Sequence, residues 1–284
     1  GVERRGKVVL INLEKPQESH RAQSRIEPSR SKAQSGIEAG RISILIHLKL
    51  TGQLIYQDEK TRIAGGHPIP PLNLPVPNKT TRVTFTFTNG GPTSPKGLRG
   101  ASHLYFNDMR KFGWVKIVGV DKSQPEAERL LDEKVKGAIG AELGPDALKI
   151  SFDEFKSRLL KKPNSRIKKL LMDQSFVSGI GNIYSDESLW RAKIHPARPV
   201  SSLTDAQIKA LYKGIGDSLK LAIEKGGSSA NSFVDSGGEK GLFLTFAKAY
   251  HMTGRPCGRC KTPIVRKKMD GRSAHFCPQC QVLK

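Results

Sequence analysis

Two pairs of closely spaced cysteines near the end of the chain have the spacing of a metal site. Cys257 and Cys260 form one C-x-x-C pair, Cys277 and Cys280 form the other, and sixteen residues lie between the pairs. Two such pairs place four thiolates around a tetrahedral ion, and this separation is typical of a zinc ribbon whose loop returns as a β-hairpin. Two disulfides or four free thiols are the alternatives, but the clustering of all the cysteines near one end argues against a disulfide framework. We therefore predict one structural zinc ion without an open coordination position, in a protein of the reducing cytoplasm.

The charge of the chain is a second chemical signal. Its 284 residues include 48 lysines and arginines against 26 aspartates and glutamates, a formal net charge of +22. Such an excess causes self-repulsion in the folded state, and a polyanionic partner is its usual reason. A membrane surface would also attract it, but the sequence has no long basic amphipathic helix and no apolar run of eighteen residues. Nucleic acid is therefore the expected partner, and no membrane association is expected.

Two segments concentrate positive charge where a nucleic acid could bind. Between 155 and 172 there are seven basic residues and no acid, and a turn from Gly179 to Asn182 follows. Asn182 is a good N-cap for the next helix, and a glycine turn that opens a helix can point free N–H groups at a phosphate, although most such turns are mere connections. The loop between the cysteine pairs carries a single acid, Asp270, against the basic residues Arg266, Lys267, Lys268 and Arg272 among others. We expect this loop to be a finger that faces DNA.

Hydrophobic patterns predict strands in the first part of the chain and helices in the later part, and these elements must position the motifs. Runs rich in Val, Ile, Phe and Thr predict strands at 7–13, 42–50, 82–88, 103–106 and 114–120. Beyond about 120 the pattern is helical, with capping boxes at 151–154 and 204–207, a short helix over 165–173, and a long apolar stripe from Ile208 to Ile223. The predicted fold class is α+β.

The same patterns suggest four parts of the chain. They are a β domain over 1–120, a linker over 121–148, a helical domain over 149–235 and a metal module over 246–284. A polar stretch near 15–40 and a proline-rich stretch near 58–80 interrupt the β domain and are expected to be solvated surface insertions.

Several further motifs occur in a fixed order along the chain. They are R-R-G-K at 4–7, I-H-L-K-L-T-G at 46–52, D-M-R-K-F-G at 108–113, L-M-D-Q at 171–174, G-N-I-Y-S-D-E at 181–187, I-H-P at 194–196, G-G-S-S at 226–229 and Tyr250. Together with the cysteine pairs, these motifs closely resemble those of the formamidopyrimidine-DNA glycosylase and endonuclease VIII family. The resemblance extends from Arg4 to the last residue, apart from the insertions, and the arginine–phenylalanine motif favours the formamidopyrimidine branch.

The resemblance implies a fold and an activity. The fold would be an N-terminal β-sandwich that is incomplete, a helix–two-turns–helix domain and a C-terminal zinc ribbon. The activity would be that of a monomeric base-excision repair enzyme, without a small-molecule cofactor, that acts on damaged double-stranded DNA in the bacterial cytoplasm. Such an enzyme flips an oxidised purine such as 8-oxoguanine out of the duplex, cuts its glycosidic bond and cleaves the strand by β,δ-elimination.

The resemblance also implies which residues would contact DNA. Arg110 and Phe112 match two of the three side chains that fill the gap left by the flipped base, and Leu50 stands where the family usually has methionine as the third. Lys168 and Asn182 match phosphate-binding residues. Arg272 matches the zinc-finger arginine that grips phosphates beside the lesion, and residues 230–243 match the loop that closes over the extruded base.

The catalytic amine is the point at which the sequence departs from the family. The family's nucleophile is an N-terminal proline followed by a glutamate, and neither precedes Lys7, which matches the lysine near that amine. A Schiff base at the sugar C1′ needs a neutral amine, and an α-amino group with a pKa of about 8 is roughly one-tenth neutral at pH 7. Gly1 opens a strand that the family places in mid-domain, and Lys7 would be a poor substitute. We therefore expect these 284 residues to be catalytically impaired, as a fragment or as the product of a truncated gene.

Two other classes of function remain open at this point. One is a damaged-DNA-binding protein without catalysis, and the other is a general zinc-ribbon adaptor for nucleic acid. The adaptor would need neither the motif at 108–113 nor the turn from Gly179 to Asn182, so we rank it last.

Overall fold

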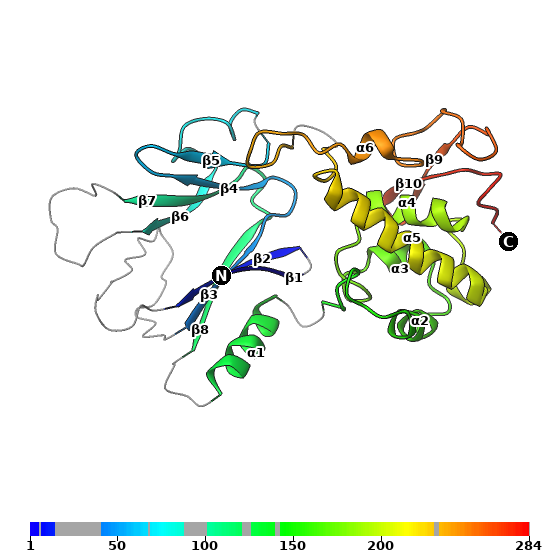
Figure 1. The fold of residues 1–284 in the computed structure, drawn as a ribbon, viewed down its shortest axis with the longest axis horizontal. Coiled ribbons are helices and arrows are strands. Elements are labelled where there is room, and N and C mark those ends of the chain that lie inside the picture. Colours follow the sequence, from blue (N-terminus) through cyan, green and yellow to red (C-terminus); the bar gives the residue numbers. More distant parts are fainter. Residues whose placement is uncertain are drawn as a thin grey trace. The chain divides into compact units, whose positions relative to one another are not determined.

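The computed structural model describes residues 1–5, 7–14, 41–67, 69–87, 101–120, 126–139, 143–229 and 233–283. They form two compact units (Figure 1). Unit 1 comprises Gly1–Ala141 together with Asn231–Glu239, and unit 2 comprises Glu142–Ala230 together with Lys240–Lys284. The insertion expected near 15–40 lies outside the described residues.

Unit 1 is built on two antiparallel sheets of four strands each (Figure 1). One sheet has the order β1-β2-β3-β8, and the other has the order β5-β4-β7-β6. The strands are β1 (Val2–Arg5), β2 (Val8–Glu14), β3 (Arg41–His47), β4 (Gly52–Gln57), β5 (Arg62–Ala64), β6 (Thr81–Phe87), β7 (Ser102–Asp108) and β8 (Trp114–Val120).

The core of unit 1 lies between the two sheets and beneath one helix. Ile44 and Ile46 of β3 pack with Phe106 of β7, whereas Leu45 packs in the cluster that includes helix α1 (Ala127–Ile139). Successive side chains of a strand point to opposite faces, so β3 is covered on both sides, which explains its unbroken apolar run. The predicted β-sandwich is therefore confirmed.

Helix α1 lies in the segment for which the sequence predicts a linker, 121–148. It packs against β3 and β8, and its Asp132 forms an ion pair of 2.5 Å with Arg5 of β1. Val135 is its buried residue, and most of its other side chains are charged or small. The apolar pattern is weak for this reason, and the helix belongs to unit 1 rather than to a linker.

The proline-rich stretch near 58–80 is also more ordered than expected. It contains β5, and Leu72 is completely buried. Gly66 exchanges two backbone hydrogen bonds with Val234, at 2.8 and 2.7 Å. Residues 233–239 consequently belong to unit 1, although the predicted helical domain extends to 235.

Unit 2 joins a group of helices to a two-stranded hairpin. The elements are α2 (Phe152–Leu160), α3 (Ile167–Met172), α4 (Asn182–Ala192), the 3-10 helix η1 (Val200–Ser202), α5 (Asp205–Glu224), α6 (Phe243–Phe246), β9 (Val265–Met269) and β10 (Arg272–Phe276). The predicted stripe of α5 packs from Ile208 to Leu219 against residues of α2, α3 and α4, among them Phe155 and Leu171, whereas Ile223 at its end is 67% exposed. The helical part and the hairpin of the expected fold are therefore both present.

The helix ends of unit 2 follow the predicted capping chemistry in part: at the start of α2 the Ser151 side chain accepts a hydrogen bond from the Glu154 N–H, which is one half of the box predicted at 151–154. Thr204 accepts a hydrogen bond from the Gln207 N–H while the Gln207 side chain accepts one from the Thr204 N–H, which is a complete capping box. At the start of α4, however, Gly181 occupies the N-cap position in an extended conformation, and Asn182 is already the first helical residue. The prediction that Asn182 is the N-cap is wrong by one residue.

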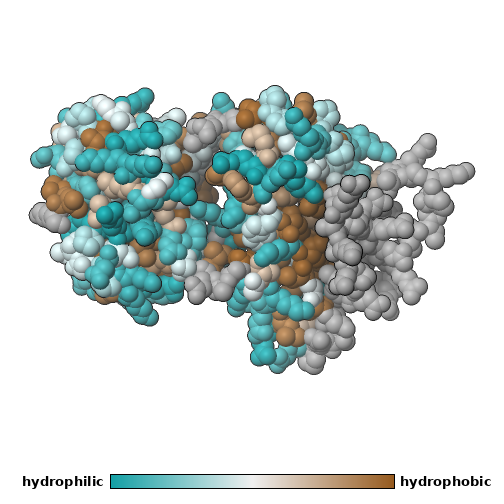
Figure 2. Space-filling model, turned by 180° about the vertical axis from the view of Figure 1, so that it is seen from behind, coloured by the Kyte–Doolittle hydropathy of each residue, from teal (hydrophilic) through white to brown (hydrophobic). Residues whose placement is uncertain are grey.

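On the face shown in Figure 2, the coloured surface is mostly hydrophilic, with apolar side chains gathered in patches. No helix within the described ranges has both the length and the apolar character that a membrane span requires.

Candidate nucleic-acid interface

Two neighbouring turns of unit 1 expose large apolar side chains. The turn between β3 and β4 carries Leu50, which is 63% exposed, and the turn between β7 and β8 carries Phe112, which is 58% exposed. The turns are adjacent because Gly52, at the start of β4, pairs with Asp108, at the end of β7. The structure thus places Leu50 and Phe112 on the same edge of the sandwich.

Basic side chains accompany the two apolar ones. The Arg110 guanidinium lies 5.2 Å from the centroid of the Phe112 ring. Lys49 and Lys111 adopt left-handed backbone conformations, with φ of 51° and 59°. Such conformations cost non-glycine residues about 1 kcal/mol each and persist only where the surrounding contacts enforce them. This edge therefore presents two exposed apolar tips within a positively charged rim.

Asp108 holds the shape of the turn that carries Arg110 and Phe112. Its carboxylate is 1% exposed and accepts hydrogen bonds from the Thr51 hydroxyl at 2.5 Å, the Arg110 N–H at 3.1 Å and the Gly113 N–H at 2.6 Å. One buried carboxylate thus ties both turns together.

Lys7 lies on the same edge and is exposed. It precedes Val8, which pairs with His47 of β3. Burial, together with the nearby charges of Lys49 and Lys7, lowers the pKa of His47 to about 4. The neutral ring accepts a hydrogen bond from the Lys49 N–H through Nδ1 at 3.0 Å.

In unit 2, Gln174 shapes the turn that opens α4. Its side-chain amide donates to the carbonyls of Ile180 at 2.8 Å and Met172 at 3.1 Å, and its oxygen accepts from the Gly179 N–H at 3.0 Å. Gly179 has a φ of +102°, which other residues rarely adopt. The glycine in the turn is therefore required by its backbone conformation.

The start of α4 has the features of an anion site. No side chain caps its first turn within the described part of the chain, so backbone N–H groups there are available. Helix N-termini favour negative charge, and such free N–H groups bind phosphate readily.

The four cysteines converge at one point of unit 2. The Sγ atoms of Cys257, Cys260, Cys277 and Cys280 lie within 4.8 Å of one another. Zn–S bonds of about 2.3 Å in a tetrahedron require sulfur separations of about 3.8 Å. All four cysteines are free, and the Cys260 and Cys277 sulfurs are 3.4 Å apart rather than the roughly 2 Å of a disulfide. The donor set therefore fits one structural zinc ion, and the disulfide alternative is excluded.

The cysteine site is attached to the end of α4 by Arg259. Its guanidinium stacks on Trp190, 3.7 Å from the ring centroid, and donates to the Trp190 carbonyl at 2.5 Å. Cations near helix C-termini stabilise the carbonyls that have no partner in the helix. The first cysteine pair is therefore anchored to the same helix whose other end forms the anion site.

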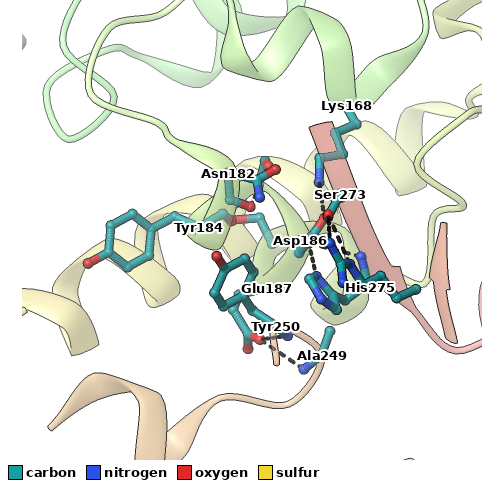
Figure 3. A network of polar contacts seen from close by, with 12 residues as sticks. Lys168, Asn182, Tyr184, Asp186, Glu187, Ala249, Tyr250, Ser273 and His275 are labelled. Atoms are coloured by element: carbon teal, nitrogen blue, oxygen red, sulfur yellow. Dashed lines mark hydrogen bonds and ion pairs between the residues drawn. The ribbon is translucent and has the colours of Figure 1, made fainter. Parts of the chain in front are cut away.

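A buried polar network connects α3, α4 and β10 (Figure 3). Lys168 Nζ lies 2.5 Å from Asp186 Oδ1 and donates to the Ser273 carbonyl at 2.7 Å. Asp186 Oδ2 accepts from the His275 N–H at 2.9 Å and lies 3.0 Å from His275 Nδ1. Burial lowers the pKa of Lys168, and the Asp186 carboxylate opposes that shift.

Glu187 makes a second connection from α4. Its carboxylate accepts hydrogen bonds from the N–H groups of Lys248, Ala249 and Tyr250 at 2.8 to 3.0 Å (Figure 3). Burial raises the pKa of Glu187, and these three donors oppose the rise. The segment that leads into the first cysteine pair is thereby fixed to α4.

A basic pocket of about 310 Å³ opens between the region of α3 and the hairpin turn. Lys162, Lys168, Lys169 and Arg272 contribute positive charge to its lining, and Asp173 and Asp270 contribute negative charge. Arg272 is exposed at the start of β10.

The structure thus groups Leu50, Arg110, Phe112 and Lys7 in unit 1, and Asn182, Lys168 and Arg272 in unit 2. Their contacts with DNA stay predictions. Sequence reasoning did not identify three acceptors that hold these groups in place: Asp108, Gln174 and Asp186. Asp108 is the one acid of the motif D-M-R-K-F-G, whose other residues are basic or neutral, and that contrast is the available signal.

Three family models match the chain. The N-terminal domain of formamidopyrimidine-DNA glycosylase matches residues 1–115, the H2TH domain of that enzyme matches 143–234, and the zinc finger found in FPG and IleRS matches 254–282.

Whole-chain relatives and solved structures agree with these matches. The formamidopyrimidine-DNA glycosylase of Pelotomaculum thermopropionicum is 36% identical over 243 residues, which is 85% of this chain and 75% of the relative. That of Ligilactobacillus salivarius is 38% identical over 245 residues, 86% of this chain and 75% of the relative. The complex of Lactococcus lactis Fpg with DNA containing an abasic site has a TM-score of 0.66 at 26% identity, covering 99% of this chain and 81% of that one. The Fpg of Thermus thermophilus has a TM-score of 0.65 at 29% identity, covering 100% and 82%.

Proposed function

Since this chain belongs to the formamidopyrimidine-DNA glycosylase family, we propose that it recognises oxidised purines, such as 8-oxoguanine and formamidopyrimidines, in double-stranded DNA. The proposed role is base-excision repair as a glycosylase and abasic-site lyase. The protein would act as a monomer on DNA in the bacterial cytoplasm, with one structural zinc ion and no small-molecule cofactor. Solved relatives bound to DNA containing an abasic site or a carbocyclic 8-oxo-G support this proposal.

The observation that carries the proposal is the edge of unit 1 with two exposed apolar tips. Leu50 and Phe112 are large apolar side chains held out into solvent by adjacent turns, and Asp108 fixes both turns. Extrusion of a base costs a few kcal/mol of unpairing and unstacking. Burial of a leucine or phenylalanine returns about 1.5–3 kcal/mol each, so two inserted side chains match that cost.

Arg110 suits the role of partner for the base that is left unpaired. Its guanidinium carries five N–H donors and can bond base-edge acceptors. The ring of Phe112 beneath it orients the guanidinium by a cation–π contact. Arg110 and Phe112 would therefore fill the gap from one turn, and Leu50 would fill it from the other.

Unit 2 supplies groups suited to the DNA backbone. The free N–H groups at the start of α4 and the NH₂ group of Asn182 would bind one phosphate, and Arg272 of the hairpin would bind another. The zinc ion would fold the hairpin that carries Arg272. Residues of the 230–243 loop would cover the extruded base.

The chemistry of base removal needs a neutral amine. The amine attacks C1′, the glycosidic bond breaks and the base leaves with a proton, which gives a Schiff base that acidifies the sugar for β- and then δ-elimination. Lys7 is exposed on the edge that carries Leu50 and Phe112, and we assign it a supporting role beside that amine.

A second candidate is damaged-DNA binding without turnover, since the exposed side chains of Leu50 and Phe112 and the uncapped start of α4 are groups suited to binding rather than to a chemical step.

Fluorescence anisotropy with two duplexes that differ in one position tests the proposal. We expect binding at least tenfold tighter to a duplex with an abasic-site analogue than to the undamaged duplex. Equal affinity for both duplexes contradicts lesion recognition.

A further inference from the structure

Lys168 does not have the surroundings of an ordinary phosphate ligand. Its side chain is 5% exposed, and its ammonium is already within bonding distance of Asp186 Oδ1 and the Ser273 carbonyl. An ammonium group has three N–H donors, so these two partners leave one at most. A phosphate contact would require Lys168 to leave the buried acid or to share its charge with it.

Asp186 uses both of its oxygens inside this network (Figure 3). Oδ1 faces Lys168 of α3, and Oδ2 faces the backbone and ring of His275 in β10. Asp186 itself belongs to α4. One buried carboxylate therefore ties two helices and the hairpin into a single body.

The position of the network relative to the DNA-facing groups gives it a function. Asp186 lies four residues after Asn182, which is one helical turn. Ser273, whose carbonyl accepts from Lys168, directly follows Arg272. The network thus lies one helical turn after Asn182 and one residue after Arg272, the two groups that are expected to bind phosphate.

We propose that Lys168 is a positioning residue and does not bind phosphate itself. Through its contacts with Asp186 and Ser273, it holds the start of α4 and the start of β10 at a fixed separation. The role assigned to it rests on the proposed binding of DNA. Two phosphate-binding groups held at a fixed distance bind a regular backbone without a further loss of conformational freedom.

The salt dependence of DNA binding distinguishes a positioning residue from a phosphate ligand. Loss of one phosphate contact lowers the slope of log K against log salt by about one. Binding of an abasic-site-analogue duplex would be measured at several salt concentrations for Lys168→Met, Arg272→Ala and the control Lys209→Met, an exposed lysine of α5. We expect Lys168→Met to weaken binding about tenfold at every salt concentration while the slope stays unchanged. Arg272→Ala should lower the slope by about one, and Lys209→Met should bind like the wild type. A slope lowered by about one in Lys168→Met overturns the proposal.

The variant Asp186→Asn separates a phosphate-binding role of Lys168 from a positioning role, because the two roles predict opposite changes in DNA affinity. If Asp186 merely restrained a phosphate-binding Lys168, its neutralisation would release the ammonium and strengthen binding. The positioning role predicts weaker binding, and it predicts that Lys168→Met/Asp186→Asn is no worse than Lys168→Met, because both changes break the same connection. Stronger binding by Asp186→Asn, or additive losses in the double variant, overturns the proposal.

Hydrogen exchange without DNA tests the connection independently of the proposed function. The His275 N–H donates to Asp186, and the Ser185 N–H closes the first turn of α4. We expect both amides to exchange at least tenfold faster in Lys168→Met and at the wild-type rate in Arg272→Ala. Unchanged exchange in Lys168→Met overturns the proposal even if DNA binding fails for another reason, and faster exchange supports the connection even if the protein has a different ligand.

Discussion

Replacement of Asp108 by asparagine should open the turn that carries Arg110 and Phe112. The carboxylate accepts three hydrogen bonds, from the Thr51 hydroxyl and from the N–H groups of Arg110 and Gly113. Asparagine keeps one acceptor oxygen but places an NH₂ donor against at least one of these donors. The change therefore removes a charge-assisted bond and leaves buried donors facing each other.

The expected loss follows from the burial of the group. Asp108 is 1% exposed, so water does not replace the lost contacts. A hydrogen bond to a charged group contributes about 1.5–3 kcal/mol, and a buried donor without a partner costs about 1–3 kcal/mol. We expect Asp108→Asn to lower the free energy of opening of this turn by about 2–4 kcal/mol.

Native-state hydrogen exchange of the Gly113 amide measures that opening directly, because this N–H donates to Asp108 at 2.6 Å. Thr51→Val removes one of the three donors and should lower the opening free energy by about 1 kcal/mol. Asp58→Asn is the matched control, since Asp58 accepts from the N–H groups of Lys60 and Thr61 in a different, exposed turn. Asp108→Asn should also weaken binding to the abasic-site duplex, whereas Asp58→Asn should not. A smaller effect of Asp108→Asn than of Thr51→Val would show that the carboxylate does not organise this turn.

Three further predictions concern other parts of the molecule. The purified chain should contain one zinc ion per molecule, and its chelation under reducing conditions should weaken DNA binding by unfolding the hairpin; elemental analysis without stoichiometric zinc contradicts this. Because the folded state lowers the pKa of His47 to about 4, the stability that its neutral ring contributes is complete above pH 6.5 and is lost as the pH falls from about 6.5 toward 4. Between pH 7 and pH 5, the free energy of unfolding by urea should fall by about 1–2 kcal/mol after solvent screening in the wild type, and this loss should be absent in His47→Gln. Gln174→Ala should loosen the turn at Gly179 and weaken DNA binding at unchanged zinc content; wild-type affinity would show that this turn does not contribute.

Local sequence signals predicted those parts of the structure whose partners are close along the chain. The cysteine pairs are the clearest case, since two residues separate the members of each pair and a short hairpin closes the site. The capping box at Thr204 and the apolar stripe of α5 are equally local, and the structure contains both.

The parts that were not predicted depend on distant partners. Asp186 meets Lys168 across 18 residues and His275 across 89, and nothing in its immediate surroundings indicates either contact. Helix α1 was missed because most of its residues are charged or small and Val135 is its buried one.

Insertion of Phe112 into damaged DNA is the central claim, and 2-aminopurine fluorescence tests it most directly. The probe would be placed opposite an abasic-site analogue, and the duplex would be saturated with the wild-type protein or with Phe112→Ala. We predict that the wild type increases the fluorescence severalfold, because the ring separates the probe from its stacked neighbour, and that Phe112→Ala binds this duplex with little increase. An equal increase with both proteins, or none with the wild type at saturation, would contradict the account.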